Sequence, residues 1–464
     1  MLLLSSSIRS RSTGTNGEAL LRYLNHRALR QGLHDGAYTG SRALTMPQLL
    51  LAFLLYLATL SGTNAGSVVT VMVTDAASGR PVPGATVTAG EVVQLTAMDG
   101  GARISLPDLT GISIGVRAPG YARAQSVLEA GEMHKVSLAQ LRPKAVYLSV
   151  YGLADRTLRE GALTLQGRTS INALVIDIKG DRGQTPHPSK ARSVSGAEAH
   201  APGPVPRVGD LASLLGTLHA RGLYLIARIV VFKDDPLALS HPEWAVRDAT
   251  GNIWQDREEL RWIDPTIKEA WAHNLDLAEE AARLGFDEIQ FDYLRFPDTG
   301  GLVFSQPNTR ANRVAAITGF LAAARHRLRP YNVFLAADIF GYVCWNLDDT
   351  AIGQQIETFD VSVDYISPML YPSGFTWGLP GCRRPTEHPG EIVARSLAEA
   401  KRRTGLSGVR FRPWLQAFRD YAFDHRDFDA DEIRQQVDAA DAAGTNGWML
   451  WNPRNRYDPD TLPR

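Results

Sequence analysis

Residues 285–297 read GFDEIQFDYLRFP, and this stretch decides the fold. Before it, apolar residues from Ile267 to Ala282 recur at intervals of three or four. That spacing predicts an amphipathic helix that begins at Asp264-Pro265 and ends at Gly285. The run 287–293 is short and mostly apolar, which is typical of a parallel strand buried on both faces. A helix followed at once by a buried strand is the repeating unit of an α/β protein.

The same alternation continues on both sides of this stretch. A helix is predicted from residue 211 to Gly222, and a capping box of Asp429 and Glu432 predicts the start of another. Eight segments have the composition of strands: 145–150, 173–178, 223–231, 287–293, 333–339, 364–370, 411–417 and 447–451. Eight strands with intervening helices predict an α/β fold, a (β/α)8 TIM barrel over residues 144–464. Only 13 residues follow Trp451, too few for a final helix and its loop. We therefore expect the linker or the β-rich segment before the barrel to close it.

Residues 67–140 have a different composition, rich in Val, Thr, Gly and Ala. Val69, Val71 and Val73 alternate with other residues, and Gly and Pro turns break the segment into short runs. This pattern predicts a small N-terminal all-β sandwich domain. The stretches 75–87 (DAASGRPVPGATV) and 118–121 (APGY) resemble carboxypeptidase-regulatory-like domains of secreted bacterial proteins. The resemblance implies a spacer or a binding unit.

Residues 49–60 read LLLAFLLYLATL, an uncharged run too short to span about 30 Å of hydrocarbon. With the small residues up to Ala65 it predicts a signal peptide over 46–65. Residues 1–45 are basic and form either a long leader or a mis-assigned start, with Met46 as the true first residue; we favour the second. An uncleaved membrane anchor is the alternative. We expect the chain from Gly66 onward to be extracytoplasmic, in the periplasm or secreted.

The composition excludes several classes of function. Lys plus Arg and Asp plus Glu both total 49, so the net charge is zero, which argues against a nucleic-acid partner. There is no phosphate-binding loop and no HExxH motif, and the 11 His show no ligand spacing, so we expect no cofactor and no metal. Cys344 and Cys382 follow neighbouring predicted strands and form either a disulfide or two separate thiols.

Polar residues stand at the carboxyl ends of the predicted strands, where TIM-barrel enzymes carry their chemistry. Asp292 and Asp338 end two neighbouring strands and are the candidate catalytic pair. Glycoside cleavage needs two such carboxyl groups, one to protonate the leaving oxygen and one to attack the sugar or activate water. The alternative is a structural ring of salt bridges. The candidate substrate-binding residues at the strand ends are Asp177, Lys179, Arg228, Arg295, Tyr371 and Gln416.

All nine Trp residues lie after position 243, and several follow predicted barrel strands. Aromatic faces at a barrel mouth combine apolar burial with a defined stacking geometry, which suits sugar rings. The alternative is that they pack loops onto the barrel. The candidates for substrate contact are Trp244, Trp262, Trp345 and Trp451.

Several segments resemble a bacterial family of glycoside hydrolase-type TIM barrels of unknown function: 226–233 (IARIVVFK), 241–247 (HPEWAVR), 262–265 (WIDP), 285–297 and 365–372 (YISPMLYP). The resemblance covers roughly residues 144 to 452. The ending at Asp292 is also similar to α-amylase-type barrels, which implies that Asp292 is the nucleophile. Asp338 is the candidate acid/base, although α-amylase-type enzymes have Glu at that position.

Together these patterns predict an enzyme, a glycoside hydrolase that cleaves a polysaccharide glycosidic bond; the α-amylase likeness favours an α linkage. The partner is a polysaccharide or oligosaccharide, with membrane contact only through an uncleaved leader. The alternative is an inactive barrel that binds cell-surface or extracellular glycan. The sugar, the endo or exo mode, the stereochemistry and the oligomeric state stay open.

Overall fold

The computed structural model describes residues 67–106, 111–128, 131–201, 203 and 205–464. The expected leader at 1–45 and signal peptide at 46–65 lie outside the described residues. Within the described ranges, no helix is both long enough and apolar enough to cross a bilayer.

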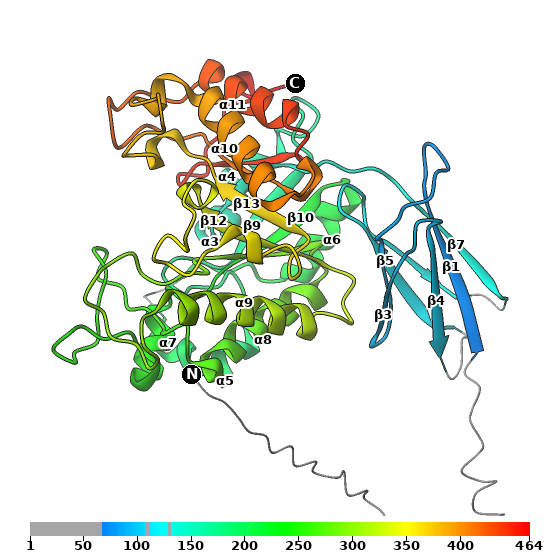
Figure 1. Cartoon of the computed structure of the whole chain (residues 1–464), viewed down its shortest axis with the longest axis horizontal. Helices are drawn as coiled ribbons and strands as arrows, with labels where there is room; N and C mark the ends of the chain where they lie inside the picture. The colour runs from blue at the N-terminus through cyan, green and yellow to red at the C-terminus, as the bar shows by residue number, and fades with distance from the viewer. Residues whose placement is uncertain (1–66, 107–110, 129–130, 202, 204) are drawn as a thin grey trace, which may run out of the picture. The chain divides into compact units, whose positions relative to one another are not determined.

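Eight parallel strands form a closed barrel, which confirms the predicted TIM barrel (Figure 1). Each strand pairs with the next one along the chain, and the last strand pairs with the first. The eight strands are β8 (Lys144–Leu148), β9 (Ala173–Lys179), β10 (Tyr224–Val230), β11 (Glu288–Asp292), β12 (Phe334–Phe340), β13 (Tyr365–Met369), β14 (Trp414–Gln416) and β15 (Trp448–Trp451). All eight overlap the segments predicted from the sequence.

The central strands are buried on both faces, as their apolar composition predicts. Every residue of β9, β10 and β11 is buried. Strand β11 pairs with β12 in a register that places Phe291 opposite Ala337. One residue further along, Asp292 and Asp338 occupy equivalent positions on adjacent strands. Because the side chains of a strand alternate, both carboxyl groups point to the same side of the sheet.

Helices between the strands form the outer layer of the barrel, and the main ones are α6 (Leu211–Ala220), α8 (Trp271–Leu284), α9 (Arg310–Arg327), α10 (Pro389–Thr404) and α11 (Ala430–Ala442). The predicted capping box of Asp429 and Glu432 is present at the start of α11. Gly285 ends α8 with φ of 109°. The predicted start of α8 at Asp264 is wrong, because the Asp264 side chain instead caps a turn at Thr266.

The barrel is closed differently from our expectation. Strand β15 pairs directly with β8, and residues after Trp451 fasten the end of β8. The Asn455 side chain accepts hydrogen bonds from Ser149 at 2.6 and 3.1 Å, and it donates one to the Tyr147 carbonyl at 3.1 Å. Tyr457 donates to the same carbonyl at 3.0 Å. The prediction that the linker or the β-rich segment completes the barrel is therefore wrong.

The N-terminal segment forms two small sheets, as predicted. One sheet orders β4 (Gly101–Leu106), β1 (Ser67–Asp75) and β7 (Met133–Leu138); the other orders β3 (Val92–Leu95), β2 (Thr86–Ala89), β5 (Ser113–Arg117) and β6 (Ala124–Val127). Both sheets contribute to one apolar core, for example through Val71 and Val116. Val69, Val71 and Val73 are buried while the residues between them are partly exposed, which is the alternation seen in the sequence.

Candidate active site

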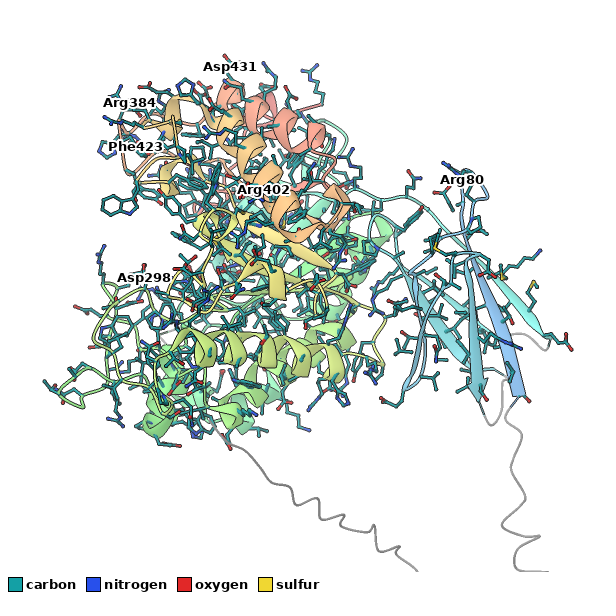
Figure 2. The ribbon with its side chains drawn as sticks, in the orientation of Figure 1. Arg80, Asp298, Arg384, Arg402, Phe423 and Asp431 are labelled. Carbon is teal, nitrogen blue, oxygen red and sulfur yellow. The ribbon has the colours of Figure 1, made fainter. Side chains whose placement is uncertain are left out.

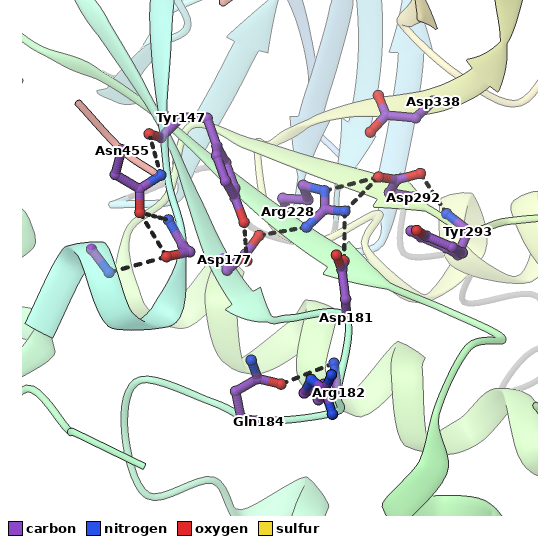
Figure 3. Close-up of polar contacts among 12 residues, drawn as sticks. Tyr147, Asp177, Asp181, Arg182, Gln184, Arg228, Asp292, Tyr293, Asp338 and Asn455 are labelled. Atoms are coloured by element: carbon purple, nitrogen blue, oxygen red, sulfur yellow. Dashed lines mark hydrogen bonds and ion pairs between the residues drawn. The ribbon is translucent and has the colours of Figure 1, made fainter. Parts of the chain in front are cut away.

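The guanidinium of Arg228 organises the carboxyl ends of the barrel strands (Figure 3). Its Nε and Nη2 donate to Asp292 Oδ2 at 2.9 and 2.6 Å. Its Nη1 donates to Asp177 Oδ1 at 2.7 Å, and its Nη2 also reaches Asp181 Oδ1 at 3.0 Å. The Arg228 side chain is 1% exposed. A buried cation shared by three carboxyl groups makes this a strongly coupled charge cluster.

Asp292 is held from two sides. Arg228 binds one carboxyl oxygen, and the backbone N–H of Tyr293 donates to the other at 2.6 Å. Tyr293 has φ of 47°, a left-handed conformation that is costly for a residue with a bulky side chain. In this conformation the backbone N–H of Tyr293 points toward the carboxylate of the preceding residue, Asp292. Both contacts are short hydrogen bonds donated to the Asp292 carboxylate, one of them by a cation.

Asp338 lies in the opposite environment. Its Oδ1 accepts a hydrogen bond from Trp414 Nε1 at 2.9 Å, while its buried Oδ2 has no hydrogen-bond partner among the described residues. Burial, together with the neighbouring negative charge of Asp292, raises the pKa of Asp338 well above its ordinary value. Figure 3 shows the two carboxyl groups beside each other. The hydrogen-bond donors thus gather on Asp292, whereas the surroundings of Asp338 favour its neutral form.

Asp177 lies behind Arg228 and supports it. Tyr147 donates to Asp177 Oδ2 at 2.6 Å. Burial raises the pKa of Asp177 to about 6, although the charge of Arg228 opposes the shift. The Tyr147 ring stacks on Trp451 at a centroid distance of 3.9 Å, and the Arg228 guanidinium lies 4.8 Å from the Trp451 ring. Arg228 is therefore held in a fixed place by aromatic as well as ionic contacts.

A cavity of about 240 Å3, called the first cavity below, opens onto this cluster. Both Asp292 and Asp338 line it. The other lining residues are Asp181, Arg228, Tyr293, Arg295, Phe340, Gln354, Met369, Tyr371, Tyr421 and Trp451. A small concave site with converging polar groups at the carboxyl ends of TIM-barrel strands is where this fold carries its chemistry.

A model of the family described as "Putative glycosyl hydrolase domain" matches residues 145–457. The chain belongs to this family. The match covers the barrel, so it confirms the family resemblance seen in the sequence. No curated protein matches the chain.

Two solved structures illustrate the likeness of this glycosyl hydrolase family member to other proteins. A hypothetical protein from Ruminiclostridium thermocellum is 35% identical, with 42% of this chain and 96% of that one covered and a TM-score of 0.36. The PgaB (BpsB) glycoside hydrolase domain from Bordetella bronchiseptica is 16% identical, with 69% of this chain and 99% of that one covered and a TM-score of 0.51. The second likeness supports the barrel fold.

Of the residues proposed from the sequence, Asp292, Asp338, Arg228, Arg295, Tyr371 and Trp451 line the first cavity, with Asp177 directly behind it. Four others lie elsewhere in this family member. Lys179 is fully buried in an ion pair with Asp234, and Gln416 is buried and donates to Ser373 at 2.7 Å. Trp345 and Trp244 pack within loops, where Trp345 Nε1 donates to Ser396 at 3.0 Å and Trp244 stacks on His241 at 3.8 Å.

Trp262 lies against a neighbouring cavity but is only 3% exposed. Its indole is covered by Arg295, whose guanidinium lies 5.0 Å from the ring, and by the Tyr293 ring at 5.6 Å. Trp262 therefore forms part of the wall of the neighbouring cavity but exposes little of its own surface to a ligand.

The sequence analysis did not select six residues that line the first cavity: Asp181, Tyr293, Phe340, Gln354, Met369 and Tyr421. Asp181 is the most accessible carboxylate bonded to Arg228, with a side chain that is 38% exposed. It lies only two residues beyond the end of β9, so its position next to a strand end could have identified it as a candidate site residue. Tyr293 follows Asp292 directly, and Tyr421 lies in a loop without any periodicity.

Two further expectations concern cysteines and metals. Cys344 and Cys382 are both buried free thiols, so the structure has the separate thiols and not the disulfide. Across the described residues, no group of three or more His, Cys, Asp or Glu side chains is placed to hold a metal ion.

Proposed function

We propose that this chain is a glycoside hydrolase that cleaves a polysaccharide with Asp338 as the proton donor and Asp292 as the nucleophile. The observation that carries the proposal is the contrast between the two neighbouring carboxyl groups. Arg228 and the Tyr293 amide stabilise a negative charge on Asp292, whereas burial and that charge favour the protonated form of Asp338. Glycosidases require this division between two carboxyl groups.

In the first step, Asp338 gives its proton to the glycosidic oxygen while an Asp292 oxygen attacks the anomeric carbon. The leaving sugar departs as an alcohol, and the other sugar stays bound to Asp292 as an ester. Asp338, now ionised, then takes a proton from water, and the hydroxide oxygen displaces Asp292. Both groups return to their starting states, so the net reaction consumes one water.

We further propose that the anomeric configuration is retained. Asp292 and Asp338 occupy equivalent positions on hydrogen-bonded strands, which lie about 4.8 Å apart. Carboxyl groups about 5–5.5 Å apart are found in retaining enzymes and those about 6.5–9.5 Å apart in inverting ones, and equivalent positions on neighbouring strands favour the shorter separation. The likeness of the strand ending at Asp292 to α-amylase-type barrels favours an α-linked substrate.

The test is hydrolysis of a panel of polysaccharides and 4-nitrophenyl glycosides by the purified protein, with NMR of the first-formed anomer. Asp292→Asn should abolish cleavage and leave the fold intact, because Arg228 keeps its contacts with Asp177 and Asp181. Asp438→Asn, a change at an exposed position on α11, is the matched control and should be fully active. Unchanged turnover by Asp292→Asn would refute the assignment. Binding of a glycan without product by the wild type would instead support the inactive, glycan-binding alternative.

We also propose that the barrel works outside the cytoplasm, because the apolar run 49–60 precedes it. Cell fractionation followed by N-terminal sequencing tests this directly. A mature chain that starts near Gly66 in the periplasm or medium is the expected result, and an unprocessed cytoplasmic chain contradicts it.

A further inference from the structure

A second cavity, of about 530 Å3, adjoins the first, and Tyr293 and Arg295 line both. At about 240 Å3 the first cavity is smaller than the roughly 300–1,000 Å3 of typical ligand sites, whereas the second falls within that range. The first cavity therefore has room for only a short part of a polymer. The second is large enough to hold the continuation of the same chain.

The wall shared by the two cavities is preformed. The Tyr293 ring lies between two cations, with Lys233 Nζ at 5.3 Å and the Arg295 guanidinium at 5.4 Å from its centroid. Arg295 also lies over the Trp262 ring, so its position is fixed by two aromatic groups. Groups held in this way need no reordering when a ligand binds, which lowers the entropic cost of association.

The charges that line the second cavity balance. Its carboxylates are Asp256, Glu258 and Asp298, and its cations are Lys233, Arg257 and Arg295. Lys233 Nζ lies 3.1 Å from Asp256 and 3.0 Å from Glu258, so these charges largely neutralise one another. Such a surface offers many hydrogen-bond donors and acceptors but no net attraction for a charged polymer. It suits the hydroxyl groups of an uncharged sugar chain.

Exposed aromatic rings lie at the end of β12 or follow β13 and β14, whereas the residues of the second cavity follow β10 and β11. Phe340, at the end of β12, is 39% exposed, and Tyr421 is 59% exposed; both line the first cavity. Trp377, which is 91% exposed, lies farther out, and its amide donates to Tyr342 Oη at 2.8 Å next to Phe340. Asp298 of the second cavity and Phe423, two residues beyond Tyr421, project on the same side of the barrel (Figure 2). Solvent-exposed rings at such positions can stack on sugar faces.

We infer that an uncharged polysaccharide binds across both cavities and is cut in its interior, with the second cavity holding sugars on one side of the cleaved bond. The exposed Phe340, Tyr421 and Trp377 rings contact the chain on the other side. This inference rests on the proposed function, because it adds binding sites to both sides of the same pair of carboxyl groups. It names the substrate class, a neutral glycan, and the mode of attack, endo cleavage.

The experiment compares the wild type with Trp254→Ala, which removes a half-buried ring from the second cavity, and with the conservative Trp254→Phe. Val361→Ala is the control, because Val361 is 77% exposed and precedes β13 at the far end of the barrel. The polymers are soluble starch, pullulan, dextran and galactomannan, with polygalacturonate and chitosan as charged counterparts. Product lengths are measured at less than 5% conversion, in parallel with hydrolysis of 4-nitrophenyl monosaccharide glycosides.

We expect long fragments as the first products from a neutral polymer. Trp254→Ala should raise the polymer KM about tenfold, with a smaller effect on kcat, and be rescued by Trp254→Phe, whereas Val361→Ala should leave cleavage of the polymer and of 4-nitrophenyl glycosides within about twofold. First products of one or two sugars, an unchanged KM in Trp254→Ala, or cleavage of only the charged polymers would overturn the inference while the proposed function stands. If the wild type cleaves no member of the panel, the proposed function fails, and the inference fails with it.

Discussion

Replacement of Arg228 by Met removes the one cation shared by three carboxylates while it keeps most of the side-chain volume. Asp177 and Asp292 are 2% and 4% exposed, so water cannot compensate for the lost charge. Removal of one partner from a buried ion pair costs about 3–5 kcal/mol of stability. We expect that loss at pH 8.

The stability that Arg228→Met loses should be smaller at acidic pH, because Asp177 is then protonated in the folded protein. Its pKa of about 6 in the folded protein exceeds the roughly 3.9 of an unfolded chain. The folded state therefore binds this proton more tightly, and the stability that it contributes is present below about pH 4 and lost as the pH rises through 6. Arg228 lowers the pKa of Asp177, so Arg228→Met raises this pKa further. In the variant, the stability contributed by protonated Asp177 is therefore lost at a higher pH than in the wild type. One additional unit corresponds to about 1.4 kcal/mol, so the variant should be at least that much closer to the wild type at pH 5.

Urea unfolding followed by tryptophan fluorescence measures this effect in the barrel, because all nine Trp residues lie after position 243. The matched control is Arg327→Met. Arg327 is 47% exposed and pairs with Asp276 and Glu279 on the surface, so its loss should cost less than about 1 kcal/mol at either pH. An Arg228→Met variant that loses the same free energy at pH 5 and pH 8, or less than 1 kcal/mol at pH 8, contradicts the reasoning.

Two other predictions concern single positions. Trp414→Phe removes the N–H that stabilises ionised Asp338, so the pKa of Asp338 should rise. The alkaline limb of the pH profile of kcat/KM should then move up by roughly one pH unit. An alkaline limb that stays in place or moves down argues against Asp338 as the acid. Gly447→Ala should cost more than about 3 kcal/mol, because a Cβ there would lie 1.8 Å from the Pro143 carbonyl oxygen at a φ of 74°. Gly405→Ala, with a similar φ of 69° but open space, should cost only about 1 kcal/mol, and equal losses in urea unfolding would exclude the steric cause.

The barrel could be predicted from the sequence because parallel strands that are buried on both faces have nearly uninterrupted apolar sequences. Polar residues at or near the ends of such runs, such as Arg228, Asp292 and Asp338, could be placed at the barrel mouth for the same reason. Their mutual arrangement could not be predicted, because it depends on register between strands. The opposite environments of Asp292 and Asp338 arise from the Tyr293 amide and Arg228 beside Asp292 and from the burial of Asp338, which the alternation of apolar residues does not reveal.

Lys179 shows where simple alternation fails. It lies two residues after Asp177, so a regular strand would point both side chains into the barrel. The pairing of β9 with β10 shifts between Arg228 and Ile229, so that Lys179 aligns with Ile229. This irregularity turns Lys179 outward to Asp234, near His273 of α8. A single extra residue in the ladder is enough to reverse the face on which a side chain lies.

The pairing of β8 with β15 has a consequence for synthesis. The hydrogen bond from Asn455 to the Tyr147 carbonyl joins residues 308 positions apart. A ribosome that has made seven of the eight strands therefore holds an open sheet, with the edge of β8 exposed to neighbouring nascent chains. Such an edge is a site for aggregation, and long-range pairing is slow. The yield of folded protein should thus depend on chaperones that shield this edge until Tyr457 has emerged.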